Sequence, residues 1–196
     1  MKILSSLIIV FVLSMVSFAK SKNPIVLLKT TEGDIYIELF PDKASKTVEN
    51  FLKYVKEGFY NGIIFHRVID GFVIQAGGFD KNFRYKKPTH EPIKNEANNG
   101  LMNLRGTIAM ARTSDPHSAN AQFFINLKDN HFLNHKNKTP QGWGYTVFGR
   151  VIKGMEIVDK IAKTPTTIKA TPYGYMRDVP VKPIIILEAK VIEGGK

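Results

Sequence analysis

The sequence predicts a mainly β protein, in which seven or eight short antiparallel strands close into a barrel and two α-helices cover its open ends. Two observations predict this class. Short apolar runs rich in β-branched and aromatic residues alternate with Gly, Asn and Pro, and two segments carry apolar residues at helical spacing. Closure would remove the exposed edges of such a sheet. The chain has 196 residues, 43% of them hydrophobic, which is enough for one domain with a full core.

The first 19 residues have the pattern of a secretory signal peptide. Lys2 precedes an apolar run from Ile3 to Val16, and the sequence Ser17-Phe18-Ala19 resembles a cleavage site. A transmembrane anchor is the alternative, but the run is shorter than the ~20 residues that a spanning helix requires. We therefore expect cleavage after Ala19, a mature domain of residues 20–196 without stable membrane insertion, and a periplasmic location, with secretion from the cell as the alternative.

The mature chain should begin with a hairpin and a helix. Two apolar stretches, Ile25–Leu28 and Ile35–Leu39, flank turn residues at Thr30–Gly33. From Ala44 to Glu57 the apolar residues fall on one helical face, and Gly58 is well placed to end the helix.

The rest of the chain alternates short strands with long irregular segments. A second helix is expected at Met155–Lys163 and a last strand at Val181–Ile192. Ligand contacts should concentrate in the segments without clear periodicity. These segments are Lys81–Gly106, Asn134–Gly144 and Thr164–Val179, and the expected strands are Ile63–Phe65, Phe72–Ile74, Thr107–Ala111, Phe123–Ile125 and Thr146–Phe148.

Arg67 is the most informative single residue. It lies between two apolar runs that the turn residues Asp70 and Gly71 join into a hairpin. An arginine among apolar strand residues either pairs with an acid or faces a ligand. A structural ion pair with Glu96 or Asp80 is therefore one interpretation, and a ligand-binding role is the other.

Composition narrows the function. The chain has 28 Lys and Arg against 17 Asp and Glu, but the basic residues are scattered, so we expect no nucleic-acid partner. It has no cysteine, so stability must come from core packing and backbone hydrogen bonds. The five histidines lack the spacing of known metal sites. A basic nuclease using His66 and Arg67 remains a distant alternative that would cleave nucleic acid with metal or steep pH dependence.

Four ordered blocks resemble the cyclophilin-type peptidyl-prolyl cis-trans isomerases, over Pro24 to Ile192. The resemblance implies a closed eight-stranded antiparallel β-barrel capped by two α-helices, with a groove outside the barrel wall. It also implies an isomerase that accelerates rotation about X-Pro bonds. Together with the signal-peptide pattern, this favours an exported enzyme that assists folding of exported proteins. A proline-segment-binding chaperone module without significant turnover is the alternative. The blocks are Phe65–Gly77, Gly106–Ala111, Ser118–Ile125 and Val147–Val151.

The resemblance also assigns site residues. Arg67 matches the catalytic arginine of the family. Phe132 and Tyr145 stand where eukaryotic members usually have tryptophan and histidine, and the lost indole N–H implies weaker cyclosporin sensitivity. Arg112 stands where many relatives carry asparagine. The substrate-binding matches are His66, Phe72, Val73, Gln75, Ala111, Arg112, Gln122, Phe124, Phe132, Leu133 and Tyr145.

The expected chemistry needs no cofactor and no metal. A fixed N–H donor can stabilise the twisted X-Pro amide more than either planar isomer. Arg67 suits this role because its planar fork stays charged and holds a direction. The expected partners are proline-containing peptides and unfolded protein clients, bound by a monomer.

Overall fold

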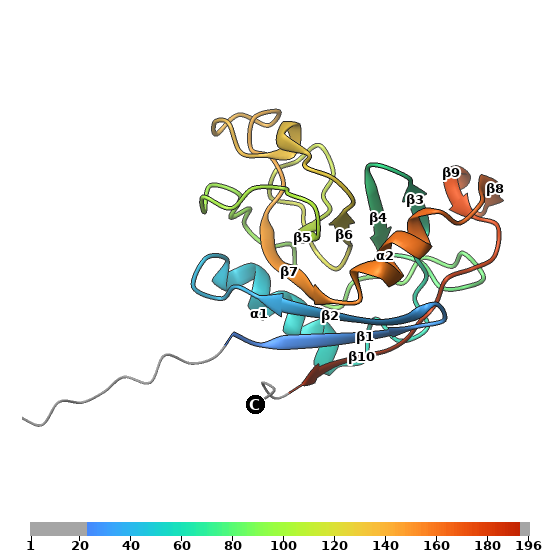
Figure 1. Ribbon diagram of the computed structural model, residues 1–196. Helices are drawn as coiled ribbons and strands as arrows, with labels where there is room; N and C mark the ends of the chain where they lie inside the picture. Colours follow the sequence, from blue (N-terminus) through green and yellow to red (C-terminus); the bar gives the residue numbers. More distant parts are fainter. Residues whose placement is uncertain (1–22, 193–196) are drawn as a thin grey trace, which may run out of the picture.

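An eight-stranded antiparallel sheet curls around the core in the computed structural model, which describes residues 23–192 (Figure 1). The predicted signal peptide, residues 1–19, lies outside the described residues. The strand order is β10-β1-β2-β7-β5-β6-β4-β3. Its strands are β1 (Ile25–Thr30), β2 (Gly33–Leu39), β3 (Arg67–Ile69), β4 (Val73–Ala76), β5 (Thr107–Met110), β6 (Phe123–Asn126), β7 (Val147–Lys153) and β10 (Ile186–Ile192).

The mainly β fold with two helices is confirmed, but the prediction of a closed barrel is wrong. The sheet is an open, strongly curled half-barrel whose edge strands are β3 and β10. Backbone hydrogen bonds from Phe65 to Ile184 (2.9 Å) and from Ile186 to Ile63 (2.8 Å) link the segment that precedes β3 to the start of β10 and to the residues just before it. β3 itself is three residues long and starts beyond this link, so no continuous ladder closes the barrel. The predicted strand Ile63–Phe65 correspondingly forms isolated bridges only.

Both predicted helices are present. α1 (Ser45–Lys56) packs against β10 and buries Val48, Phe51 and Tyr54. Gly58 follows it with φ of +65° and donates its N–H to the carbonyl of Val55 over 3.1 Å. This left-handed conformation satisfies a carbonyl at the helix end, as expected for glycine. α2 (Met155–Ala162) packs against β2, β3 and β4. Among the described residues, no helix has the length and hydropathy needed to cross a membrane.

The strands in the middle of the sheet are apolar on both faces. Ile74 and Phe123 belong to the main core inside the curl, whereas their neighbours Val73 and Phe124 belong to a second apolar cluster. Successive side chains of a strand point to opposite faces, so this second cluster lies on the outer face of β4 and β6. The inward orientation expected for Phe123 agrees with this arrangement. An apolar outer face on a sheet marks a place where something binds.

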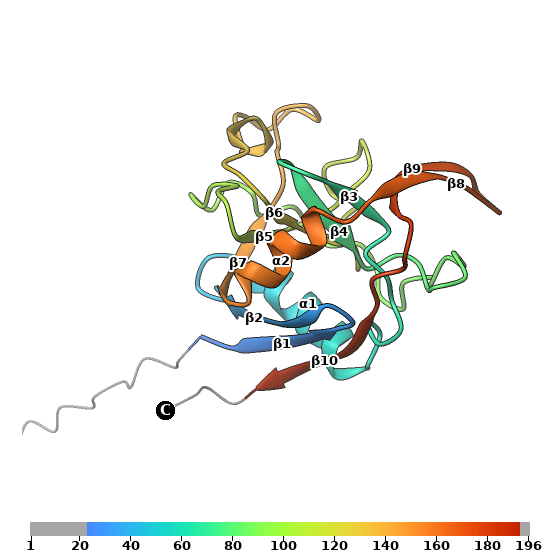
Figure 2. The same ribbon diagram turned by 45° about the vertical axis from the view of Figure 1, so that its right-hand side comes forward.

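Thr164–Val179 was expected to be irregular, and that expectation is wrong. It contains the two-stranded hairpin of β8 (Thr166–Thr171) and β9 (Gly174–Pro180), which projects from the curled sheet (Figure 2). β8 is almost wholly exposed and carries only one large apolar residue, Ile168, so its apolar pattern is too weak to predict a strand. β9 packs against β3 and so covers that edge of the half-barrel.

Candidate active site

A pocket opens on the outer face of the sheet, above the second apolar cluster. The buried side chains of Val73, Phe124 and Leu133 line it, and Ala109 and Val147 complete the apolar cluster to which they belong. Leu133 comes from the short 3-10 helix His131–Leu133, which follows β6 and folds back over the sheet. The residues that line the pocket are Arg67, Phe72, Val73, Gln75, Ala111, Arg112, Phe124, Leu133 and Tyr145. All of these were assigned to the site from the sequence.

Arg67 is the cation at the edge of this pocket. It is the first residue of β3 and lies opposite Gln75 in the β3–β4 ladder. Its Nη1 lies 3.5 Å from Oε1 of Gln75, and its guanidinium carbon lies 5.9 Å from the centre of the Phe72 ring. Gln75 in turn donates from Nε2 to Oε1 of Gln122 over 3.0 Å. The guanidinium is therefore held by a short chain of side chains on two adjacent strands.

The ion-pair partner of Arg67 is Asp178 of β9. The distance from Nε of Arg67 to Oδ2 of Asp178 is 3.9 Å. The acids considered from the sequence are engaged elsewhere, so that interpretation is wrong. Glu96 accepts hydrogen bonds from the backbone and hydroxyl of Thr47, and Asp80 accepts from backbone N–H groups of its own turn. No pattern in the sequence could have singled out Asp178, because the hairpin that carries it was not recognised.

Arg112 holds the far rim of the pocket with its side chain. Its Nε donates to the carbonyl of Gly144 over 2.9 Å, and its guanidinium carbon lies 4.7 Å from the centre of the Tyr145 ring. Tyr145 meets Phe124 edge to face, with ring centres 5.6 Å apart. Arg112 thereby ties the segment before Tyr145 to the end of β5. It can shape the pocket in this way without any contact between its guanidinium and a ligand.

Three of the assigned residues lie outside the pocket lining. Gln122 lines a neighbouring hollow that also includes Gln75, Ala111 and Arg112. Phe132 is 61% exposed and stacks on Phe72 with ring centres 5.6 Å apart, so it extends the rim outward.

His66 is buried against Phe79, with ring centres 5.0 Å apart, and its Nδ1 has no hydrogen-bond partner in the described part of the chain. Burial, together with the adjacent charge of Arg67, lowers the pKa of His66 to about 4. His66 is therefore neutral at physiological pH, and it packs on Phe79 rather than lining the pocket.

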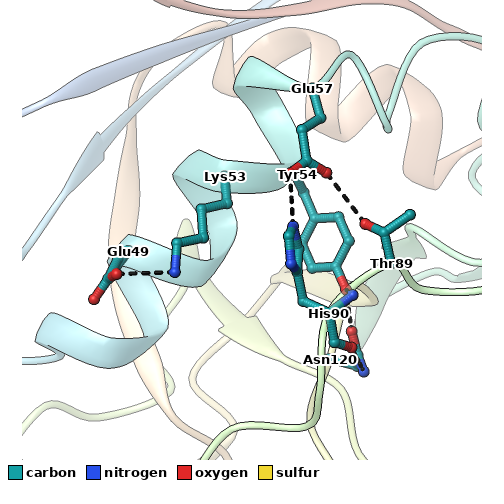
Figure 3. Close-up of polar contacts among 7 residues, drawn as sticks. All are labelled: Glu49, Lys53, Tyr54, Glu57, Thr89, His90 and Asn120. Atoms are coloured by element: carbon teal, nitrogen blue, oxygen red, sulfur yellow. Dashed lines mark hydrogen bonds and ion pairs between the residues drawn. The ribbon is translucent and has the colours of Figure 1, made fainter.

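The wall of the neighbouring hollow is anchored to α1 (Figure 3). Asn120 lines this hollow, accepts a hydrogen bond from the Tyr54 hydroxyl and donates to the carbonyl of His90 over 2.8 Å. The His90 ring lies 2.7 Å from Glu57, which also accepts from Thr89 over 3.1 Å. Burial raises the pKa of the Tyr54 hydroxyl, so it remains a donor. These hydrogen bonds connect Asn120 and the segment Thr89–His90 to the C-terminal end of α1.

An open half-barrel with an outward-facing apolar pocket, lined by Arg67 and Arg112, fits a class of protein that binds a peptide segment on the outside of its sheet. Residues 25–191 match the family model described as "Cyclophilin type peptidyl-prolyl cis-trans isomerase/CLD". The chain therefore belongs to the cyclophilin-type peptidyl-prolyl cis-trans isomerase family. It is an isomerase, as the resemblance of its four sequence blocks implied.

Known relatives agree with this assignment. The chain is 56% identical over 168 residues to peptidyl-prolyl cis-trans isomerase B of Escherichia coli K12, covering 86% of this chain and 99% of that one. It is 50% identical over 194 residues to peptidyl-prolyl cis-trans isomerase A of Dickeya dadantii, covering 98% of each.

A similar fold has been solved for a cyclophilin type peptidyl-prolyl cis-trans isomerase of Cryptosporidium parvum. The TM-score is 0.70 at 27% identity, covering 88% of this chain and 99% of that one. Another structure of that protein, solved in the presence of the dipeptide Ala-Pro, has a TM-score of 0.69 at 27% identity, covering 87% of this chain and 99% of that one.

Proposed function

We propose that Arg67 is the catalytic residue of this isomerase and that the apolar pocket beside it receives the proline ring. The observation that carries the proposal is the position of the guanidinium, fixed at the edge of a pocket walled by Phe72, Phe124 and Leu133. These three side chains exclude water and grip the ring, while the residue before proline stays free to rotate. The solved relative with Ala-Pro supports a prolyl ligand for this site.

The chemistry follows from the electronic structure of the amide. Resonance gives the X-Pro bond partial double-bond character and a rotation barrier of about 20 kcal/mol. In the twisted state that resonance is lost, the nitrogen becomes pyramidal and its lone pair can accept a hydrogen bond. Among residues 23–192, the hydrogen bonds and ion pairs of Arg67 engage Nη1 and Nε. Nη2 is thus the nitrogen that can donate to the prolyl nitrogen, and this bond stabilises the twisted state more than either isomer.

The test is an isomerisation assay with substitutions of Arg67. Arg67→Ala removes the donor and Arg67→Lys keeps the charge but not the planar fork, so each should lower kcat/KM by about 100-fold, the usual effect of losing a transition-state donor. Both variants should fold normally, because the side chain is partly exposed. Near-normal turnover by either one would contradict the directional donor. Peptide binding equal in wild type and variant, with neither accelerating isomerisation, would indicate a binding module instead.

We further propose that the protein assists folding of exported proteins in the periplasm and acts as a monomer. Lys2, the apolar run that follows it and the sequence Ser17-Phe18-Ala19 support an export signal. Fractionation of cells that express the full chain, with N-terminal sequencing of the product, tests this. A periplasmic product that begins at Lys20 is expected. A cytoplasmic product that begins at Met1 would contradict the proposal.

A further inference from the structure

The hairpin β8–β9 brings an acid to Arg67 from a distant part of the chain. Asp178 lies on β9, 111 positions after Arg67, and its carboxylate faces the Nε edge of the guanidinium at 3.9 Å. Gln75 contacts a different edge of the same group, at Nη1. Two polar side chains therefore contact the guanidinium of Arg67 from two sides. The centre of the Phe72 ring lies 5.9 Å from the guanidinium carbon.

Asp178 is placed with unusual backbone geometry. Its φ is +60°, a conformation that few residues other than glycine adopt and that Asp and Asn tolerate best. The next residue, Val179, is 1% exposed and packs with Ile64 and Phe83 in a separate apolar cluster. The root of the hairpin is thereby fixed to the segment that leads into β3. A bent backbone next to a buried anchor points the carboxylate at Arg67.

The ion pair is unsuited to stabilising the fold. The side chains of Arg67 and Asp178 are 39% and 42% exposed. Exposed pairs of this kind contribute about 0–1 kcal/mol to the free energy of unfolding. An arginine fork loses little entropy for each contact it makes because it is planar and rigid, so a contact at Nε restricts the rotation of the whole group. The contact therefore matters for the direction of Nη2 more than for folding.

We propose that Asp178 is a positioning residue for Arg67, which together with Gln75 fixes the plane of the guanidinium so that Nη2 faces the prolyl nitrogen. The inference rests on the proposed role of Arg67 as the donor. Asp178 acts through Arg67 and makes no contact with the reacting amide. The hairpin β8–β9 is accordingly part of the active site, although its exposed strands lie outside the curled sheet (Figure 2).

The main variant is Asp178→Asn, which keeps the side-chain shape and tolerates the positive φ but removes the charge. Exchange NMR on a short X-Pro peptide gives the isomerisation rate of the bound peptide, and a titration gives its Kd. We expect the rate to fall about fivefold to tenfold with Kd changed less than about twofold, since misdirection affects the transition state more than the planar ligand. Asp178→Gly should behave like Asp178→Asn, because it also permits the backbone conformation.

Two controls separate positioning from a structural role. Asp34→Asn removes an exposed acid on β2 and should leave both rate and Kd unchanged. In an Arg67→Lys background, Asp178→Asn should have less than about a twofold further effect, because the planar fork it orients is already gone. A structural defect would instead lower the rate in both backgrounds and lower the thermal midpoint.

Each outcome is decisive. An unchanged or increased rate in Asp178→Asn, with wild-type protein active and Arg67→Ala inactive, would overturn the role of Asp178 and leave that of Arg67 intact. The role of Asp178 would also be overturned if Asp178→Asn lowered the rate equally in the wild-type and Arg67→Lys backgrounds. Full activity of Arg67→Ala would instead overturn the proposed function on which the inference rests.

Discussion

Gln75 donates a hydrogen bond to Gln122 over 3.0 Å, and this bond leaves the Gln75 Oε1 facing Nη1 of Arg67 at 3.5 Å. An amide can turn by 180° and exchange its oxygen for its NH₂ group with little change of shape. An NH₂ group facing the guanidinium would be repelled. The guanidinium therefore favours Oε1 of Gln75 on its side, and Gln122, although it belongs to the neighbouring hollow, supports the same orientation by accepting from the NH₂ group of Gln75.

Replacing Gln122 should thus weaken catalysis from a distance. Gln122→Met keeps the length of the side chain and removes its acceptor, so Gln75 loses its fixed orientation. We expect kcat to fall about threefold to tenfold with little change in KM, the pattern of a lost transition-state interaction. Glu156→Met, at an exposed position of α2, is the control and should have no effect. Equal activity of the two variants would show that the amide orientation is irrelevant.

Catalysis should vary little between pH 6 and about 9. Arginine side chains do not titrate in this range. The nearest titratable ring, His66, has a pKa lowered to about 4 and therefore stays neutral there as well. The measurement is kcat/KM at constant ionic strength in overlapping buffers. A tenfold change across pH 6 to 7 would show that a titrating group takes part and that the arginine alone does not explain the rate.

Much of the site could be predicted because it consists of sequence blocks on short strands. Val73 and Phe124 point outward by the two-residue period, and the family resemblance identified Arg67, which lines the same pocket. His66 does not line the pocket, although it precedes Arg67 in the sequence, because its side chain is buried against Phe79. Asp178 could not be found, since its contact with Arg67 depends on a hairpin without apolar periodicity and on a positive φ that the sequence does not specify.

His66 should make the protein less stable in acid. Its folded-state pKa of about 4 lies below the ordinary value of 6.5, so the unfolded chain binds the proton more tightly. Above pH 6.5 both states are neutral and the residue has no effect. Stability is then lost as the pH falls toward 4, by about 2 kcal/mol at pH 5.

His66→Leu tests this by removing the titrating group from a position where Nδ1 makes no hydrogen bond to any of residues 23–192. Urea unfolding of both proteins at pH 7.5 and pH 5 gives the difference in the free energy of unfolding, in which the contributions of other titrating groups cancel. We expect the leucine variant to lose about 2 kcal/mol less than wild type between the two pH values. Parallel losses in both proteins would show that His66 is protonated in the folded state.

Gly77 should be needed for both the fold and the site. It ends β4 with φ of +98°, and a Cβ there would lie 2.6 Å from the carbonyl oxygen of Ala121 and 2.8 Å from Cα of Gln122. Gly62 has a similar φ of +81°, but a Cβ there would meet nothing within 4 Å. An alanine at either position costs about 1–2 kcal/mol of backbone strain. At Gly77 it must also displace the Ala121–Gln122 backbone just before β6, which adds about 1–3 kcal/mol.

Gly77→Ala should therefore lower the free energy of unfolding by about 2–5 kcal/mol, and Gly62→Ala by about 1–2 kcal/mol, as measured in urea. The displaced backbone belongs to Gln122, so the hydrogen bond that orients Gln75 should also be disturbed. Turnover measured at a temperature where both variants are fully folded should fall for Gly77→Ala and stay at the wild-type level for Gly62→Ala. Equal losses of unfolding free energy in the two variants would mean that the Ala121–Gln122 backbone moves away from the added Cβ without cost. Full activity of Gly77→Ala despite its lower stability would show that the contact of Gly77 with the Ala121–Gln122 segment does not control the orientation of Arg67.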